Sequence, residues 1–364
     1  MESEHTQSEE RAGKRAARRS SEDPMKMNAA GRSRLLDLIS RFAGLPVLVL
    51  GDLVADEFVL GEIDRVSREA PVLILKEREK RIVPGGGANA ANNLADFGVA
   101  LTLVGAAGED GAGEKLIEHF RAKGVATEHV IRPAGYRTPT KSRILGALGH
   151  GRPQQIVRVD REPAAPLDAA IRQSLTESAV GRLGEVSAVL VSDYGYGATS
   201  PREMERLRMG RDALRLRHPP ITLDSRYDLG QYTRVTAATP NEPEMEQTFG
   251  ARVGDRLEVL DALAERVLRH QQFEALLVTR GKDGMVLYEP GQPRRALGIF
   301  GSDEVTDVTG AGDTVIAVFT AALGAGATFL DAAVLANCAG GLVVMKSGTA
   351  TVTAQELAGA VRSL

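Results

Sequence analysis

The segment DVTGAGDT, residues 307–314, places three small residues directly before a carboxylate. At the start of a helix, Gly310, Ala311 and Gly312 would let a ligand approach the backbone, and the amides of the first turn and the helix dipole favour an anion there. The same dipole would hold Asp313 as a carboxylate, so we expect it to accept a proton from a substrate hydroxyl. This pattern predicts phosphoryl transfer from a nucleotide to an alcohol.

The same segment is compatible with a glycine-rich helix start followed by an ordinary N-terminal aspartate. A glycine in regular structure costs about 0.5 to 1 kcal/mol, so two glycines beside a carboxylate favour a functional reason. The sequence contains neither a Walker A pattern nor a protein-kinase catalytic loop. A kinase built on this segment therefore belongs to neither of those two classes.

A second glycine run, VPGGGANAANNLADFG, spans residues 83–98. It fits the dinucleotide pattern G-x-G-x-x-A, but that fold needs a buried apolar strand just before the glycines, and the preceding KEREKRIV is charged. We interpret the run as a glycine turn that opens a helix. It would offer Asn89 and the backbone of Gly86 and Gly87 to the hydroxyls of a sugar.

The elements that position these residues follow an alternating pattern. From residue 31 onward, strand-like and helix-like runs alternate, which is typical of an α/β fold with a mostly parallel sheet and helices on both faces. Several predicted strands end in polar residues, at the edge where such sheets bind ligands. These residues are Asp52, Asp193, Asp224, Asn241, Glu244 and Thr279. Each of them could instead be an ordinary loop residue or helix cap.

Two stretches, about 57–80 and 136–162, contain short alternating strands separated by turn residues. They predict a small antiparallel β layer that projects from the main domain as a lid. Lys141, Arg143 and Arg158 lie on strands of this lid and could bind a phosphate group of the substrate. The alternative is that these cations form a solvated strand face.

The composition excludes several classes of protein. The 364 residues are 43% hydrophobic, enough for a large core, and the formal net charge of -3 with no Trp argues against nucleic-acid binding. No apolar run is long enough to span a membrane, and a cytoplasmic location is expected. Residues 1–30 are polar and predict a disordered tail before a single domain over 31–364. The lone Cys338 excludes an internal disulfide and is expected in the core.

Three segments carry a resemblance to a known family. GGGANAANNLADFG and DVTGAGDT resemble the two signature segments of the ribokinase-like (PfkB) carbohydrate kinases, and NEPE resembles their N-x-x-E motif. The three occur in the family's order, and the resemblance runs from about Leu45 to the C terminus. Within the family, RVSREAPV, QQIVRVD and SGTATVT are most similar to the heptose-7-phosphate kinase domain of bacterial ADP-heptose synthase.

The resemblance implies a role for each matching residue. Asp313 would be the base, and the amides of Gly310, Ala311 and Gly312 would form the anion hole. Through water, Mg²⁺ would be held by Asn241 and Glu244. The residues expected to bind ATP are Arg226, Thr279, Gly281 and Asn337. Those expected to hold sugar hydroxyls are Asp52, Gly86, Gly87 and Asn89.

The resemblance also implies a substrate and partners. The reaction would be ATP-dependent phosphorylation of the anomeric hydroxyl of D-glycero-β-D-manno-heptose 7-phosphate, in lipopolysaccharide supply, with K⁺ as a further candidate cofactor. Lids of this family often clasp a partner, so we expect a homodimer through the lid; its alternating strands need cover for one apolar face. No H-x-G-H segment precedes Leu364. A separate adenylyltransferase is therefore expected to perform the later step of the pathway.

Departures from the subgroup leave the sugar open. Arg226 stands where a phosphate-contacting lysine is usual, Tyr196 follows SDYG where the subgroup has lysine, and Arg68 replaces a proline. Fructose 1-phosphate, ribose or a nucleoside remain alternative substrates. Outside this class, the alternatives are a nicotinamide-dependent oxidoreductase and a sugar-binding protein without catalysis.

Overall fold

The computed structural model describes residues 24–147, 151, 153–214, 219–254, 256–301, 306–346 and 348–364. The first 23 residues of the expected tail lie outside this part of the chain. Residues 24–30, by contrast, belong to the folded domain rather than to the tail. Met25 packs in the core, and Asn28 caps helix α2, Ala29–Ser40, by accepting a hydrogen bond from the Gly31 amide.

Within the described residues, nine strands form one central sheet in the order β13-β12-β11-β10-β9-β8-β1-β4-β5. The strands are β1 Pro46–Gly51, β4 Ala100–Ala106, β5 Val130–Ile131, β8 Ala188–Asp193, β9 Ile221–Ser225, β10 Ala237–Ala238, β11 Ala275–Thr279, β12 Met285–Tyr288 and β13 Arg295–Leu297. At one edge, β12 pairs antiparallel with both β11 and β13, and the remaining pairs are parallel. The predicted mostly parallel sheet is confirmed.

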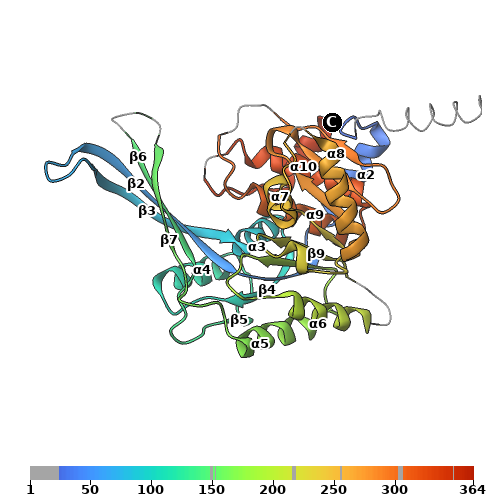
Figure 1. Ribbon diagram of the computed structural model, residues 1–364, viewed down its shortest axis with the longest axis horizontal. Coiled ribbons are helices and arrows are strands. Elements are labelled where there is room, and N and C mark those ends of the chain that lie inside the picture. The colour runs from blue at the N-terminus through green and yellow to red at the C-terminus, as the bar shows by residue number, and fades with distance from the viewer. Residues whose placement is uncertain are drawn as a thin grey trace, which may run out of the picture.

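Helices cover both faces of this sheet (Figure 1). Besides α2 they are α3 Gly87–Asp96, α4 Gly111–Ala122, α5 Ala169–Val180, α6 Pro201–Asp212, α7 Glu242–Phe249, α8 Leu257–Arg266, α9 Ala311–Gly324, α10 Phe329–Val343 and α11 Ala354–Arg362, with short turns η1 Leu229–Gln231, η2 Val267–Gln271 and η3 Gly281–Asp283. None of those described is long and apolar enough to cross a membrane.

Alternate side chains of β1 enter two separate cores, because successive residues of a strand point to opposite faces. Val47 and Val49 pack in the core that includes side chains of α3, α9 and α10, whereas Leu48 and Leu50 pack in the core beside α5, α6 and α8. The lone Cys338 lies buried in α10, as expected. This double packing holds the ends of the parallel strands in fixed positions.

A second, four-stranded sheet in the order β3-β2-β6-β7 projects from the central sheet (Figure 1). Its strands are β2 Leu53–Val66, β3 Leu73–Gly86, β6 Thr140–Ala147 and β7 Gln154–Arg161. The expected antiparallel pairing joins β2 to β3 and β6 to β7, while the central pair β2–β6 is parallel. We call this sheet the lid. Because β3 continues directly into α3, the glycine run joins the lid to the main domain.

Candidate active site

The start of α9 is shaped by its small residues. Gly310 adopts a left-handed conformation with φ of 80°, and a Cβ atom there would lie 2.5 Å from Asn89 Nδ2. The Ala311 amide donates to the Val308 carbonyl oxygen at 3.2 Å, whereas a Cβ atom on Gly312 would meet no heavy atom within 4 Å. The helix therefore begins with open space at Gly312, where its dipole favours an anion.

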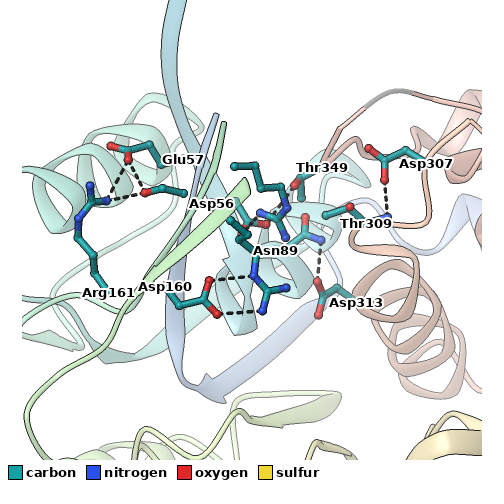
Figure 2. A network of polar contacts seen from close by, with 12 residues as sticks. Asp56, Glu57, Asn89, Asp160, Arg161, Asp307, Thr309, Asp313 and Thr349 are labelled. Atoms are coloured by element: carbon teal, nitrogen blue, oxygen red, sulfur yellow. Dashed lines mark hydrogen bonds and ion pairs between the residues drawn. The ribbon is translucent and has the colours of Figure 1, made fainter. Parts of the chain in front are cut away.

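Asp313 lies in the first turn of α9 and is only 5% exposed. Its Oδ2 accepts a hydrogen bond from Asn89 Nδ2 at 2.8 Å, and its Oδ1 accepts one from the Tyr194 hydroxyl at 2.9 Å. Figure 2 shows the Asn89 contact. Burial raises the pKa of Asp313 to about 7, although the two hydrogen bonds and the positive charge of Lys141 act to lower it. Burial thus outweighs the helix dipole expected to favour the ionised form, and a carboxyl group with this pKa suits a general base.

The glycine run lies where backbone and side chains approach closely. A Cβ atom on Gly86, whose φ is 53°, would be 2.8 Å from a Val54 methyl group, and one on Gly87 would be 2.8 Å from the Asp52 carbonyl oxygen. Asn89 is fully buried, and its amide group is engaged by Asp313 and by the Gly310 carbonyl oxygen at 3.4 Å. The structure therefore places Asn89 against Asp313, where we had expected it to bind sugar hydroxyls.

Asp52 is the clearest difference from the sequence prediction. Its buried carboxylate accepts three backbone hydrogen bonds, from the amides of Tyr194 at 2.8 Å, Tyr196 at 3.0 Å and Ala198 at 2.8 Å. Burial raises the pKa of Asp52 to about 6. Because three amides donate to this carboxylate, Asp52 holds the loop after β8 in place, where we had expected it to bind a sugar hydroxyl.

Sequence reasoning missed Asp56, which lies on the same side of β2 as the site (Figure 2). Asp56 is buried, pairs with Arg143 Nη1 at 2.6 Å and accepts a hydrogen bond from the Thr349 hydroxyl at 3.1 Å. Its charge contributes to the raised pKa of Asp313. The available signal was the pair of adjacent carboxylates, Asp56 and Glu57, inside the apolar strand segment VADEFV.

The cations of the lid differ in their surroundings. Burial, together with the charge of Arg226, lowers the pKa of Lys141, whose ammonium lies 5.1 Å from the centre of the Tyr194 ring. Arg226 itself is exposed and lies over the Tyr227 ring. The charge of Lys141 acts both on Arg226 and on Asp313, so two cations lie between the lid and the strand ends. An anion between the lid and α9 would relieve the repulsion between them.

The two lid arginines pair with different carboxylates. Arg143 is 12% exposed and pairs with Asp56, whereas Arg158, directly opposite on β7, is 46% exposed and binds both oxygens of Asp160 at 2.9 Å. Glu57 and Arg161 form a separate pair on the other side of the lid strands (Figure 2). Arg143 is therefore the more closely integrated with the site.

The three residues expected along the nucleotide line one cavity of about 210 Å³. Thr279, Gly281 and Asn337 share it with Gly312 at the start of α9, and Asn337 also donates to the Gly298 carbonyl oxygen at 2.6 Å. Apolar side chains complete the walls, namely Met285, Ile299, Phe300, Val308, Val315 and Val344. An apolar slot that ends at an open helix start suits a nucleotide, with the nucleobase in the slot and the phosphates at the helix start.

The N-x-x-E motif forms a capping box at α7. The Asn241 side chain accepts from the Glu244 amide at 2.8 Å, and Glu244 accepts from the Asn241 amide at 2.9 Å. Burial raises the pKa of Glu244, and both burial and the charge of Glu244 raise the pKa of Asp224. Two desolvated carboxylates fit a cation. The part of the chain that the structure describes holds no group of three acidic, His or Cys side chains around one metal position.

Comparisons with known proteins agree with this geometry. Residues 53–356 match the family described as pfkB family carbohydrate kinase. The bifunctional protein HldE of Desulfatibacillum aliphaticivorans is 36% identical over 321 residues, 88% of this chain and 63% of that protein. The HldE of Azotobacter vinelandii is 39% identical over 323 residues, 88% of this chain and 65% of that protein. The chain thus spans less than two thirds of the length of these relatives.

Solved structures share the fold. The Arabidopsis thaliana ribokinase complexed with ribose and ATP superposes with a TM-score of 0.66 at 19% identity, over 88% of this chain and 99% of that one. Phosphofructokinase-2 from Escherichia coli, in complex with substrates and products, gives a TM-score of 0.68 at 16% identity over the same shares. These similarities confirm the predicted ribokinase-like fold.

Proposed function

This chain belongs to the pfkB family of carbohydrate kinases, and on that premise we propose that it phosphorylates the anomeric hydroxyl of D-glycero-β-D-manno-heptose 7-phosphate with ATP. The observation that carries the proposal is the position of Asp313, a buried carboxyl group between the open start of α9 and the cations of the lid. The heptose is supported by the subgroup resemblance and by 36% to 39% identity with proteins named HldE.

The proposed reaction is an in-line transfer. The anomeric oxygen attacks the γ-phosphorus of ATP, Asp313 accepts the hydroxyl proton, and the bond to the leaving ADP oxygen breaks. The open first turn of α9 at Gly312 stabilises the negative charge on the transferred group. Lys141 and Arg143 would bind the phosphate that the sugar already carries, and Arg158 would join them if its pairing with Asp160 opens. Arg226 would contact the phosphates of ATP.

We propose ATP as the phosphoryl donor and Mg²⁺ as its metal ion, with K⁺ as an additional candidate. Asn241 and Glu244 would hold Mg²⁺ through water, beside the Asp224 carboxyl group. When bound, Mg²⁺ would neutralise charge on the phosphates.

The proposed assembly is a homodimer formed through the lid. Apolar side chains of the lid are exposed in the single chain, namely Val66, Val72, Leu73, Ile156, Val157 and Val159. Exposed apolar patches on lid strands are a frequent basis of association. We further propose that the enzyme works in the cytoplasm and supplies heptose for lipopolysaccharide. A separate adenylyltransferase would act at a later step of the same pathway.

The test is an ADP-release assay with Mg²⁺ and ATP. The substrates are the heptose 7-phosphate, fructose phosphates, ribose and nucleosides. Selective turnover of the heptose phosphate is the expected result. Selective turnover of another sugar would keep the kinase mechanism and replace the substrate, whereas binding of a sugar without turnover would overturn the catalytic proposal.

A further inference from the structure

The Tyr194 hydroxyl is the second donor to Asp313, and the mechanism above gives it no role. Tyr194 follows β8, is partly buried, and donates to Asp313 Oδ1 at 2.9 Å. Burial, followed by the charge of Asp313, raises its own pKa well above the ordinary value. The phenol therefore stays protonated across the working pH range and acts only as a donor to this carboxylate.

The loop that carries Tyr194 is fixed by two carboxylates. Asp52 accepts the amides of Tyr194, Tyr196 and Ala198, and Asp193 accepts the Gly195 amide at 3.0 Å. Such charge-assisted bonds to consecutive amides leave the loop little freedom. The position of the phenol beside Asp313 is consequently fixed by the hydrogen bonds of the loop backbone as well as by the packing of the ring.

Charges from several elements act on Asp313. Asp56 on β2 and Asp224 on β9 disfavour its ionised form, while Lys141 on β6 favours it. The positive charge of Arg226, after β9, acts on Tyr194 and on Asp224. Because burial and two neighbouring carboxylates oppose ionisation, the ionised form depends on its two hydrogen bonds and on Lys141.

We propose that Tyr194 is a positioning residue for the base: its hydroxyl stabilises the ionised Asp313 carboxylate and holds its orientation toward the sugar hydroxyl. Asn89 holds Oδ2 and Tyr194 holds Oδ1, so the carboxylate cannot rotate without losing both bonds. Each oxygen keeps a second lone pair for the substrate proton. This inference rests on the proposed phosphoryl transfer with Asp313 as base.

The experiment compares Tyr194→Phe with the wild-type protein across the pH range. In the variant, the pH at which kcat/KM for the sugar phosphate is half-maximal should rise by on the order of one pH unit, because the ionised base has lost a donor. Activity should therefore fall about tenfold on the acid side and approach the wild-type value in alkali. The matched control is Tyr196→Phe, which removes a hydroxyl that donates to Glu162 at 3.1 Å from the same loop and should leave the midpoint unchanged.

A uniform loss of activity at every pH, with an unchanged midpoint, would contradict the proposal that Tyr194 stabilises the ionised Asp313 carboxylate. If Tyr194→Phe does not fold, 3-fluorotyrosine at position 194 keeps the shape and has a more acidic, stronger donor, so the midpoint should move in the opposite direction; no movement would overturn the proposal. A wild-type protein without ADP release on any sugar would instead refute the proposed function, so the two failures are distinguishable.

Discussion

Burial and hydrogen bonding act in opposite directions on the Asp313 carboxyl group. Burial alone would keep it protonated at neutral pH, and a protonated group cannot accept a proton. The donors Asn89 and Tyr194, with the Lys141 charge, bring the pKa back to about 7. The group is therefore basic enough to accept a hydroxyl proton and still ionised in a useful fraction of molecules.

Replacing Asp313 with Asn should lower kcat by a factor on the order of 10² to 10⁴, because the base is lost while the site keeps its shape. The Asn amide can accept from Asn89 and donate to the Tyr194 oxygen, so both contacts survive. Steady-state kinetics with ATP and the sugar phosphate measure the effect, and a melting curve confirms folding. A folded variant with near-normal kcat would remove Asp313 from the role of base.

The same variant should gain stability relative to the wild type as the pH rises. The folded pKa of Asp313, about 7, lies above its ordinary value of 3.8, so its contribution to stability is largest below pH 3.8 and is lost as the pH rises through 7. The neutral Asn has no such loss. Between pH 5 and pH 8 the difference in free energy of unfolding should change by roughly 3 kcal/mol in favour of the variant, since each of the two pH units below the folded pKa is worth about 1.4 kcal/mol. Urea unfolding at both pH values measures it, and a constant difference would contradict the assigned burial.

The sequence indicated where two helix starts approach other chain segments closely. In DVTGAGDT and VPGGGANA, a Cβ atom on Gly310, Gly86 or Gly87 would come within 3 Å of a neighbouring segment. The sequence pattern could not show whether Asp52 or Asp56 faces the site, because both lie near the start of one extended segment. Only the packing of the 194–198 loop gives the Asp52 carboxylate its three amide donors.

At the scale of elements, the orientation of the lid strands and the length of β10 could not be predicted. Alternation of side chains is the same in parallel and antiparallel strands, so the parallel β2–β6 pair has no local signal. The segment VTAATPNEPE contributes only the two-residue strand Ala237–Ala238, because Pro240 and the capping box at Asn241 begin α7. The residues that start helix α7 therefore limit the length of β10.

The two faces of the lid allow a matched test of its role. Arg143 faces the site beside Asp56, so Arg143→Ala should raise KM for the sugar phosphate at least tenfold and change KM for ATP little. Arg161, on the opposite face, pairs with Glu57, and Arg161→Ala should leave both constants unchanged. Steady-state kinetics on each substrate separate the cases. Equal effects of Arg143→Ala on both substrates would refute its placement at the sugar phosphate.

For the whole molecule, the alternation of strands and helices was sufficient to predict the architecture. A continuous apolar strand such as PVLVLG must be covered on both faces, and the helices before and after it supply that cover. The sequence pattern carries less information about the lid surface. Whether an alternating strand faces water or a second chain depends on the partner, and a single chain leaves both faces of the lid open to solvent over much of their length.

The exposed lid predicts the outcome of one association experiment. Val157 and Val159 lie on one face of β7 and are 47% and 44% exposed, so a homodimer through the lid would bury both. Burying one Val is worth about 1.5 to 3 kcal/mol, and 1.4 kcal/mol is tenfold in affinity, so the double variant with Asp at both positions should weaken association at least a hundredfold.

Sedimentation velocity over a range of concentrations measures this association, with Met209→Asp as the control. Met209 is 59% exposed on α6, outside the lid, so adding a charge there should leave the dimer intact. An equal weakening by both changes would indicate a general effect of added charge. A wild-type protein that stays monomeric at every concentration would refute the lid dimer, because the apolar side chains of β7 would then have no partner chain to cover them.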